Sequence, residues 1–305
     1  MRTAMGIAAA TALLLTGCTE TAAPAPTEPV DRQSVLRTLR GIDTCALFAG
    51  AETVAGHDVT IEGPASPLSC DARFGDADQK TDGSIALNSV SGRPTNEPSW
   101  VKHRTIDGID VTTASSLDDP QIGSRDQVVS ASCQFTARYP EQVTLMVMVS
   151  APPDTDGCAI AEELTRTAMR EYPKKPQWGS TDVARTVLTG ADPCAVVRRL
   201  QPAHRIDVDV TNSSVNSCAF TLDGVPDLLV DFAYGDPTLL EYNADQFTVD
   251  GHRVSGDKAS GIFDVVVGDQ FTVGDRTLIP QVTIIDSSAD MDRVRLIAQA
   301  VADEY

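Results

Sequence analysis

Hydrophobic and polar side chains alternate along several short segments, the pattern of a β-strand with one face in a core. Two such segments, Ser69–Phe74 and Ser217–Leu222, each carry a cysteine. A third, residues 143–149, has valine or leucine at every second position and two methionines between them. We expect this third strand to be covered on both faces.

Helical spacing marks the end of each half of the chain, where apolar residues recur at intervals of three and four and so share one helix face. These residues are Ile160, Ala161, Leu164 and Ala168 in the first half, and Val294, Ile297 and Val301 in the second. A helix is also expected at the start of each half. Asp43 and Asp192 can cap free backbone amides there, and Pro193 suits a first helical turn.

The two halves repeat one another. The stretch GIDTCA at 41–46 matches GADPCA at 190–195, and Ser-Cys at 69–70 matches Ser-Cys at 217–218. Four more matches follow in the same order: TIDG at 105–108 with TVDG at 248–251, QFT at 134–136 with 270–272, QVT at 142–144 with 281–283, and EY at 171–172 with 304–305. Each Asp-Gly pair predicts a two-residue hairpin. Six matches in one order indicate a duplicated domain.

The predicted fold class is therefore α+β, with two similar domains, each an antiparallel sheet with an opening and a closing helix, stapled by disulfides. We expect the first repeat at residues 33–175, a linker at 176–189 and the second repeat at 190–305. Residues 182–188 of the linker have some helical character.

The first 18 residues predict an export signal. Arg2 precedes an apolar run at 4–15 that is too short to span a bilayer. The sequence LTGC at 15–18 matches a lipobox, so Cys18 is expected to carry a lipid anchor; the alternative is an ordinary cleaved signal with an incidental cysteine. Residues 19–32, rich in proline and alanine, predict a flexible tether. These features predict a palmitate-bearing lipoprotein on the extracytoplasmic face of the cell membrane.

With Cys18 assigned to lipid, six of the seven cysteines remain, and six allow fifteen pairings. The exported location favours disulfides. The second half contains two cysteines, which pair if it folds independently, and the repeat extends this pairing to the first half. The predicted bridges are Cys45–Cys70, Cys133–Cys158 and Cys194–Cys218. The second-half equivalents of Cys133 and Cys158 are expected at Asp269 and near Met291, where both cysteines are missing.

The chain has a formal net charge of -19, and both halves are acidic. This charge argues against nucleic acid as a partner, because nucleic acid is a polyanion. Solubility explains the acidity more simply than a specific cationic ligand does.

No recognised catalytic motif is present, and no catalytic, cofactor-binding or metal-binding residue is assigned. Four histidines, His57, His103, His204 and His252, are scattered along the chain and are expected to be structural. The acidic pairs at 118–119 and 162–163 are expected to be solvated surface. The stretch at 207–212 starts like a calcium loop, but Asn212 stands where glycine is needed. Its alternating valines predict a strand with acidic residues facing outward.

The order of these features resembles the actinobacterial lipoproteins grouped as domain of unknown function 3558. The residues that carry the resemblance are Asp-Thr-Cys-Ala at 43–46, Ser-Cys at 69–70, Ser-Cys-Gln-Phe at 132–135 and Gly-Cys-Ala-Ile-Ala-Glu-Glu-Leu at 157–164. The second half lacks the late cysteine pair, and the tandem arrangement departs from the single domain usual in that family. The resemblance implies a disulfide-bonded envelope lipoprotein and no particular chemistry.

Three functions remain open at this stage. The first is a non-enzymatic binding or sensing module for an envelope protein or small ligand. The second is an envelope hydrolase of unrecognised type, which requires a histidine and a carboxylate to meet in one cleft. The third is a structural adaptor, which requires a large exposed apolar patch.

Overall fold

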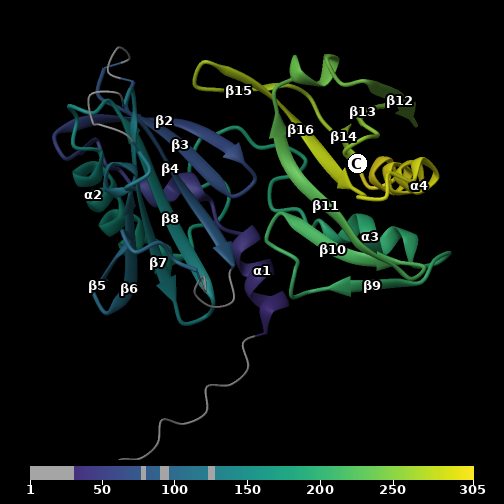
Figure 1. The fold of residues 1–305 in the computed structure, drawn as a ribbon, viewed down its shortest axis with the longest axis horizontal. Coiled ribbons are helices and arrows are strands. Elements are labelled where there is room, and N and C mark those ends of the chain that lie inside the picture. The colour runs from purple at the N-terminus through teal and green to yellow at the C-terminus, as the bar shows by residue number, and fades with distance from the viewer. Residues whose placement is uncertain (1–30, 77–79, 90–95, 123–127) are drawn as a thin grey trace, which may run out of the picture.

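A computed structural model describes residues 31–76, 80–89, 96–122 and 128–305 of the chain. The strands form two antiparallel sheets of eight strands each, and the described helices are few (Figure 1). The sequence prediction of antiparallel sheets is confirmed, while its emphasis on helices is only partly met. The lipidation expected at Cys18 and most of the predicted tether lie outside the described residues.

The first sheet is formed by the first half of the chain. Its strands are β1 (Thr53–Val54), β2 (His57–Ser66), β3 (Ser69–Phe74), β4 (Asp82–Ser89), β5 (Lys102–Ile106), β6 (Ile109–Ser115), β7 (Ala131–Tyr139) and β8 (Val143–Ala151). They lie in the order β1-β2-β3-β4-β8-β7-β6-β5. Its helices are α1 (Arg32–Arg40), the 3₁₀ helix η1 (Thr44–Phe48) and α2 (Gly157–Glu171), with short 3₁₀ turns η3 (Ser116–Asp118) and η5 (Tyr172–Lys174).

The second sheet is formed by the second half. Its strands are β9 (Ile206–Asp209), β10 (Ser217–Leu222), β11 (Val225–Gly235), β12 (Asp245–Val249), β13 (His252–Asp257), β14 (Ile262–Val266), β15 (Phe271–Val273) and β16 (Arg276–Ile285). The order is β12-β13-β14-β16-β11-β10-β9, with β15 paired to β16 off this path. Its helices are α3 (Cys194–Leu200) and α4 (Met291–Ala302), with a 3₁₀ turn η6 (Leu239–Glu241).

The two sheets share one strand order. The series β2-β3-β4-β8-β7-β6-β5 in the first has the same connectivity as β9-β10-β11-β16-β14-β13-β12 in the second. The Asp-Gly hairpins occupy equivalent places, since Asp107-Gly108 joins β5 to β6 and Asp250-Gly251 joins β12 to β13. All four residues have positive φ, as a tight two-residue turn requires, so both predicted hairpins are confirmed.

The hairpins also fix the register between the halves, and they correct two of the sequence matches. Counting along the pairings from each hairpin places Phe135 of β7 in the position of Phe263 of β14. The match of Phe135 with Phe271 is therefore wrong, because β15 is an additional strand at the edge of β16. The match of 142–144 with 281–283 is displaced by two residues, since Leu145 occupies the position of Val282.

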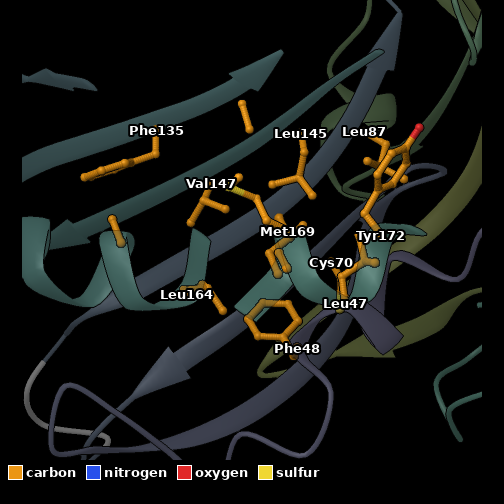
Figure 2. Close-up of a cluster of buried hydrophobic side chains, with 14 of the residues drawn as sticks. Leu47, Phe48, Cys70, Leu87, Phe135, Leu145, Val147, Leu164, Met169 and Tyr172 are labelled. Atoms are coloured by element: carbon orange, nitrogen blue, oxygen red, sulfur yellow. The ribbon is translucent and has the colours of Figure 1, made fainter. Parts of the chain in front are cut away.

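Each sheet buries an apolar layer under its helices. In the first half, alternate residues of β7 and β8 pack against α2, and η1 packs against α2 and the strands β2, β3 and β4 (Figure 2). The labelled side chains in this layer include Leu47, Phe48, Phe135, Leu145, Val147, Leu164 and Met169. In the second half, α3 and α4 cover the corresponding layer. The predicted strand at 143–149 is confirmed, but its coverage on both faces is wrong at Met148, whose residue is 41% exposed.

Three disulfides are present, and they are the pairs that the repeat predicts. Cys45–Cys70 links η1 to β3, Cys133–Cys158 links β7 to α2, and Cys194–Cys218 links α3 to β10. Each bridge therefore ties a helix to a strand of its own sheet.

Where the first half ties its closing helix by a disulfide, the second half has a buried ion pair at the start of its closing helix. By register, Cys133 corresponds to Gly261 and not to Asp269 as expected; a Cβ added at Gly261 would lie 2.0 Å from the carbonyl oxygen of Asp286. The carboxylate of Asp286 instead accepts two bonds from Arg293 in the first turn of α4, at 2.8 and 3.1 Å. Asp286 is 1% exposed. The closing helix of the second half is thus held by charge as well as packing.

The opening helices are confirmed. The first half has the 3₁₀ helix at Thr44–Phe48, capped by Asp43, and the second has α3, where the Asp192 carboxylate accepts from the Cys194 amide. An unpredicted helix, α1, precedes η1 and begins at Arg32, the last residue of the expected tether; the carboxylate of Asp31 accepts from the Ser34 amide at its start. Residues 182–188 contain no helix.

Candidate functional site

Helix α1 lies between the two sheets and contacts both halves of the chain (Figure 1). Its first residue, Arg32, donates from Nη1 to the Ser89 hydroxyl at the end of β4, over 3.0 Å. The same guanidinium donates from Nε to the Val210 carbonyl at 2.9 Å and from Nη2 to the Ser213 carbonyl at 2.8 Å. One side chain therefore joins the first sheet to the loop between β9 and β10.

The last residue of α1, Arg40, makes a second set of contacts to the second half. Its Nε donates to the Val215 carbonyl at 2.9 Å, and its Nη1 lies 2.9 Å from the Asp192 carboxylate. The Arg40 carbonyl accepts from the indole nitrogen of Trp178 at 2.7 Å. The Arg40 side chain is 12% exposed. Both ends of α1 are thus fixed against the second half by hydrogen bonds.

A cavity of about 320 Å³ lies between α1 on one side and α3 with β9 on the other. We call it the interface cavity. Its lining comprises Gln33, Leu36, Arg37, Arg40, Asp192, Cys194, Arg198, Gln201, Val208, Val210 and Ser213. Four of these residues come from α1 and the rest from the second half, so neither half forms the cavity alone.

The charges in the interface cavity are unlike those of the chain as a whole. Three guanidinium groups, from Arg37, Arg40 and Arg198, surround one carboxylate, from Asp192. Burial lowers the pKa of Arg40, the Asp192 charge raises it, and the positive charges of Arg198 and Arg37 lower it again. The cavity is therefore locally positive in a chain whose formal net charge is -19.

The single carboxylate is already saturated by the protein. Oδ1 of Asp192 pairs with Arg40 and accepts from the Cys194 amide at 3.2 Å, and Oδ2 pairs with Arg198 at 2.8 Å. Arg37 is exposed, and no ion pair or hydrogen bond joins its side chain to any residue of the described ranges. The positive charge of Arg37 is accordingly free for a ligand.

Two further lining residues are apolar, and the hydroxyl of a third, Ser213, is already hydrogen-bonded. Leu36 is buried and Val208 is half-buried, so they present hydrocarbon to the cavity. The hydroxyl of Ser213 donates to the Asp209 carbonyl at 2.7 Å and accepts from the Ala219 amide at 3.0 Å. Because its proton is engaged and no base adjoins it in the lining, this serine lacks the arrangement of an activated nucleophile. The geometry suits binding rather than covalent chemistry.

The second contact between the halves is a cavity of about 420 Å³ bordered by β2, β3 and the turn between β15 and β16. Its lining contains four acidic and three basic residues, and two ion pairs join some of them. Arg276 lies 2.6 Å from Asp71, and Arg73 lies 3.4 Å from Glu62. Burial raises the pKa of Asp71 and Glu62, and the neighbouring arginines oppose that rise. We interpret this contact as one that holds the two halves together.

None of the four histidines borders either of these cavities. His103 lies 2.7 Å from Glu97, His204 lies 2.7 Å from Asp223, and His252 shares a hydrogen bond with the Val266 carbonyl at 2.8 Å. His57 is half-buried on β2. His103 and His204 thus each pair with a carboxylate, and neither pair lines these two cavities.

The candidate acidic residues are dispersed. Asp118 pairs with Lys102 at 2.7 Å, and Glu162 pairs with Arg104 and Arg166 on the surface of the first half. In the stretch 207–212, β9 ends at Asp209, whose carboxylate caps the following turn. Asp207 and Asp209 are exposed as predicted. In the described ranges no three His, Cys, Asp or Glu side chains are arranged to hold a metal ion.

Sequence reasoning missed the arginines of the interface cavity. A signal for α1 was present, because Asp31 is a capping residue and Leu36 and Leu39 share one helix face. No local signal shows that Arg37 and Arg198, from different halves, meet at one cavity.

No family model, curated protein or solved structure matches this chain. The resemblance to domain of unknown function 3558 stays a prediction. None of the described helices is long and apolar enough to cross a bilayer.

Proposed function

We propose that this chain is a lipid-anchored cell-envelope protein that binds a small ligand in the interface cavity. We further propose that it consists of two copies of one α+β unit, an interpretation supported by the shared strand order and the equivalent hairpins. The observation that carries the binding function is that α1 and the second half jointly line a cavity containing Arg37, which has no ion pair or hydrogen bond from its side chain within the described ranges.

Two physical features favour binding over a purely structural joint. A volume of about 320 Å³ falls at the small end of ligand pockets. The hydrogen bonds of Arg32 and Arg40 hold the walls in place, so binding would cost little ordering of the protein.

The proposed anchor would keep the cavity close to the membrane. Helix α1 follows the tether directly, and an extended chain between Cys18 and Arg32 reaches at most about 50 Å at roughly 3.5 Å per residue. A ligand released at the membrane surface is therefore within reach of the cavity.

The test is native mass spectrometry of the full chain, purified from its own membrane in mild detergent. We expect a small molecule that is lost on denaturation. In Gln33→Trp the new indole should fill the cavity and abolish this extra mass, because Gln33 lines the cavity and its side chain makes no hydrogen bond among the described residues. Ser34→Trp is the matched control, since Ser34 is exposed on the same helix outside the lining.

Equal occupancy in wild type and Gln33→Trp would place the ligand elsewhere. A wild-type chain that carries no small molecule and gains none from an envelope extract would refute the proposed function.

A further inference from the structure

We infer that the interface cavity selects a small organic oxyanion, a carboxylate or a phosphate ester, with a short apolar portion. This inference deepens the proposed function and rests on it. The cavity lies between α1 and α3 and is lined by both charged and hydrocarbon side chains.

The charges of the lining determine the sign of the ligand charge. The lining contains three arginines and one aspartate, an excess of two positive charges. The aspartate oxygens are occupied by Arg40, Arg198 and the Cys194 amide, so no free acceptor remains on it for a cationic ligand. A cation would meet repulsion from Arg37 without gaining a partner, whereas an anion would relieve the repulsion among the guanidinium groups.

The arginines determine which anionic group of the ligand the cavity can bind. A guanidinium presents several N–H donors in a plane, which matches the paired oxygens of a carboxylate or phosphate. Arg37 and Arg40 are three residues apart on α1 and therefore lie on one side of that helix. Arg37 is free to donate, while Arg40 is fixed by its bonds to Val215 and Asp192. Arg37 can thus adjust its position to donate to the ligand, while Arg40 supplies a positive charge that is held in place.

The apolar lining and the volume of the cavity limit the uncharged portion of the ligand. Leu36 and Val208 offer an apolar wall beside the arginines. The volume of about 320 Å³ accommodates a compact molecule or a lipid headgroup, and is too small for the acyl chains of a whole phospholipid. The shared chemistry is an oxyanion, whose source is either a free metabolite or a lipid headgroup of the adjacent membrane.

The experiment is calorimetric titration of the full chain in neutral detergent with four hexyl probes: hexyl phosphate, hexanoate, hexanol and hexylammonium. We expect at least one of the two anions to bind at least tenfold more tightly than hexanol and hexylammonium. The affinity should fall as salt is raised, because the partly exposed Arg37 is screened. Hexanol or hexylammonium binding as tightly as both anions, or no probe binding above background, would overturn the inference.

The variant Arg37→Gln removes this guanidinium and breaks no ion pair or hydrogen bond within the described residues. It should weaken the bound anion about tenfold or more, while Arg170→Gln, which removes an exposed positive charge from α2, should leave the affinity unchanged. Equal binding by Arg37→Gln and wild type would contradict the inference even if both bind the probe.

Two further arms separate the alternatives. Phosphatidylglycerol vesicles that displace the anionic probe, where phosphatidylcholine vesicles do not, would identify a lipid headgroup as the source; displacement only by soluble phosphate esters or carboxylates would identify a free metabolite. A copurified neutral ligand that Gln33→Trp excludes would leave the proposed function standing and refute the oxyanion inference alone.

Discussion

Asp231 should make the second half less stable at neutral pH than at acidic pH, and replacing it with asparagine should remove this difference. Asp231 lies on β11 between Val230 and Phe232, both buried in the core under α3 and α4. Its side chain therefore lies on the opposite face of the sheet. There, burial raises the pKa of Asp231 from 3.8 to about 6.

The sign and size of the effect follow from this pKa. Between pH 3.8 and about 6 the folded chain keeps a proton on Asp231 that the unfolded chain releases, so stability falls as pH rises through this window. Above the window the ionised carboxylate lowers the free energy of unfolding by up to about 3 kcal/mol. Each pH unit between the unfolded and folded pKa values contributes about 1.4 kcal/mol to this loss. Asp231→Asn should thus be more stable than wild type by about 2 to 3 kcal/mol at pH 7.5, and nearly equal to it at pH 3.5.

The assay is urea unfolding of both proteins at pH values from 3.5 to 7.5, followed by circular dichroism. The control is Asp207→Asn on β9, an exposed position whose replacement should change stability by less than about 0.5 kcal/mol. A variant Asp231→Asn that is less stable than wild type by the same amount at every pH would refute the reasoning. It would mean that the Asp231 carboxylate makes a stabilising contact, and that this contact outweighs the cost of burying the charge.

Two further predictions concern how the closing helices are held. Arg293→Ala should destabilise the second half by about 3 to 5 kcal/mol in urea unfolding, because it leaves the buried carboxylate of Asp286 without its positively charged partner; a loss below about 1 kcal/mol would show that this ion pair contributes little to holding α4. Replacing Cys133 and Cys158 together with serine should cost about 3.5 kcal/mol by the loop-entropy relation for a separation of 25 residues, measured in the same way; an unchanged midpoint would show that this bridge adds nothing to stability.

The sequence predicts the local elements of this fold well where the signal lies within a few residues. The strands at Ser69–Phe74 and Ser217–Leu222 occur with the expected bounds, since alternation reports directly on burial. The Asp-Gly hairpins also form as expected, because positive φ at two successive residues is demanded by the turn itself. The cysteine pairs follow from the repeat.

The sequence fails where the outcome depends on distant parts of the chain. The matching QFT stretches align Phe135 with Phe271, but strand pairing puts Phe263 in the equivalent place because β15 is an extra strand. The pairing of Arg293 with Asp286 also escaped sequence analysis. Both residues are of charged types that are usually exposed, yet Asp286 is 1% exposed.

The candidate site is the least predictable feature of all. Its arginines come from α1 and α3, and their meeting depends on how the two halves pack together through Arg32 and Arg40. Nothing in either segment alone distinguishes Arg37 from an ordinary exposed arginine.

The measurement that tests the central claim most directly is photo-crosslinking from inside the interface cavity. A benzophenone amino acid placed at position 33, in the full chain in its own membrane, should capture a small anionic molecule whose mass is read on the intact protein. The same probe at position 34, which is exposed outside the cavity, should capture none. No adduct at position 33 above the level at position 34 would contradict the account.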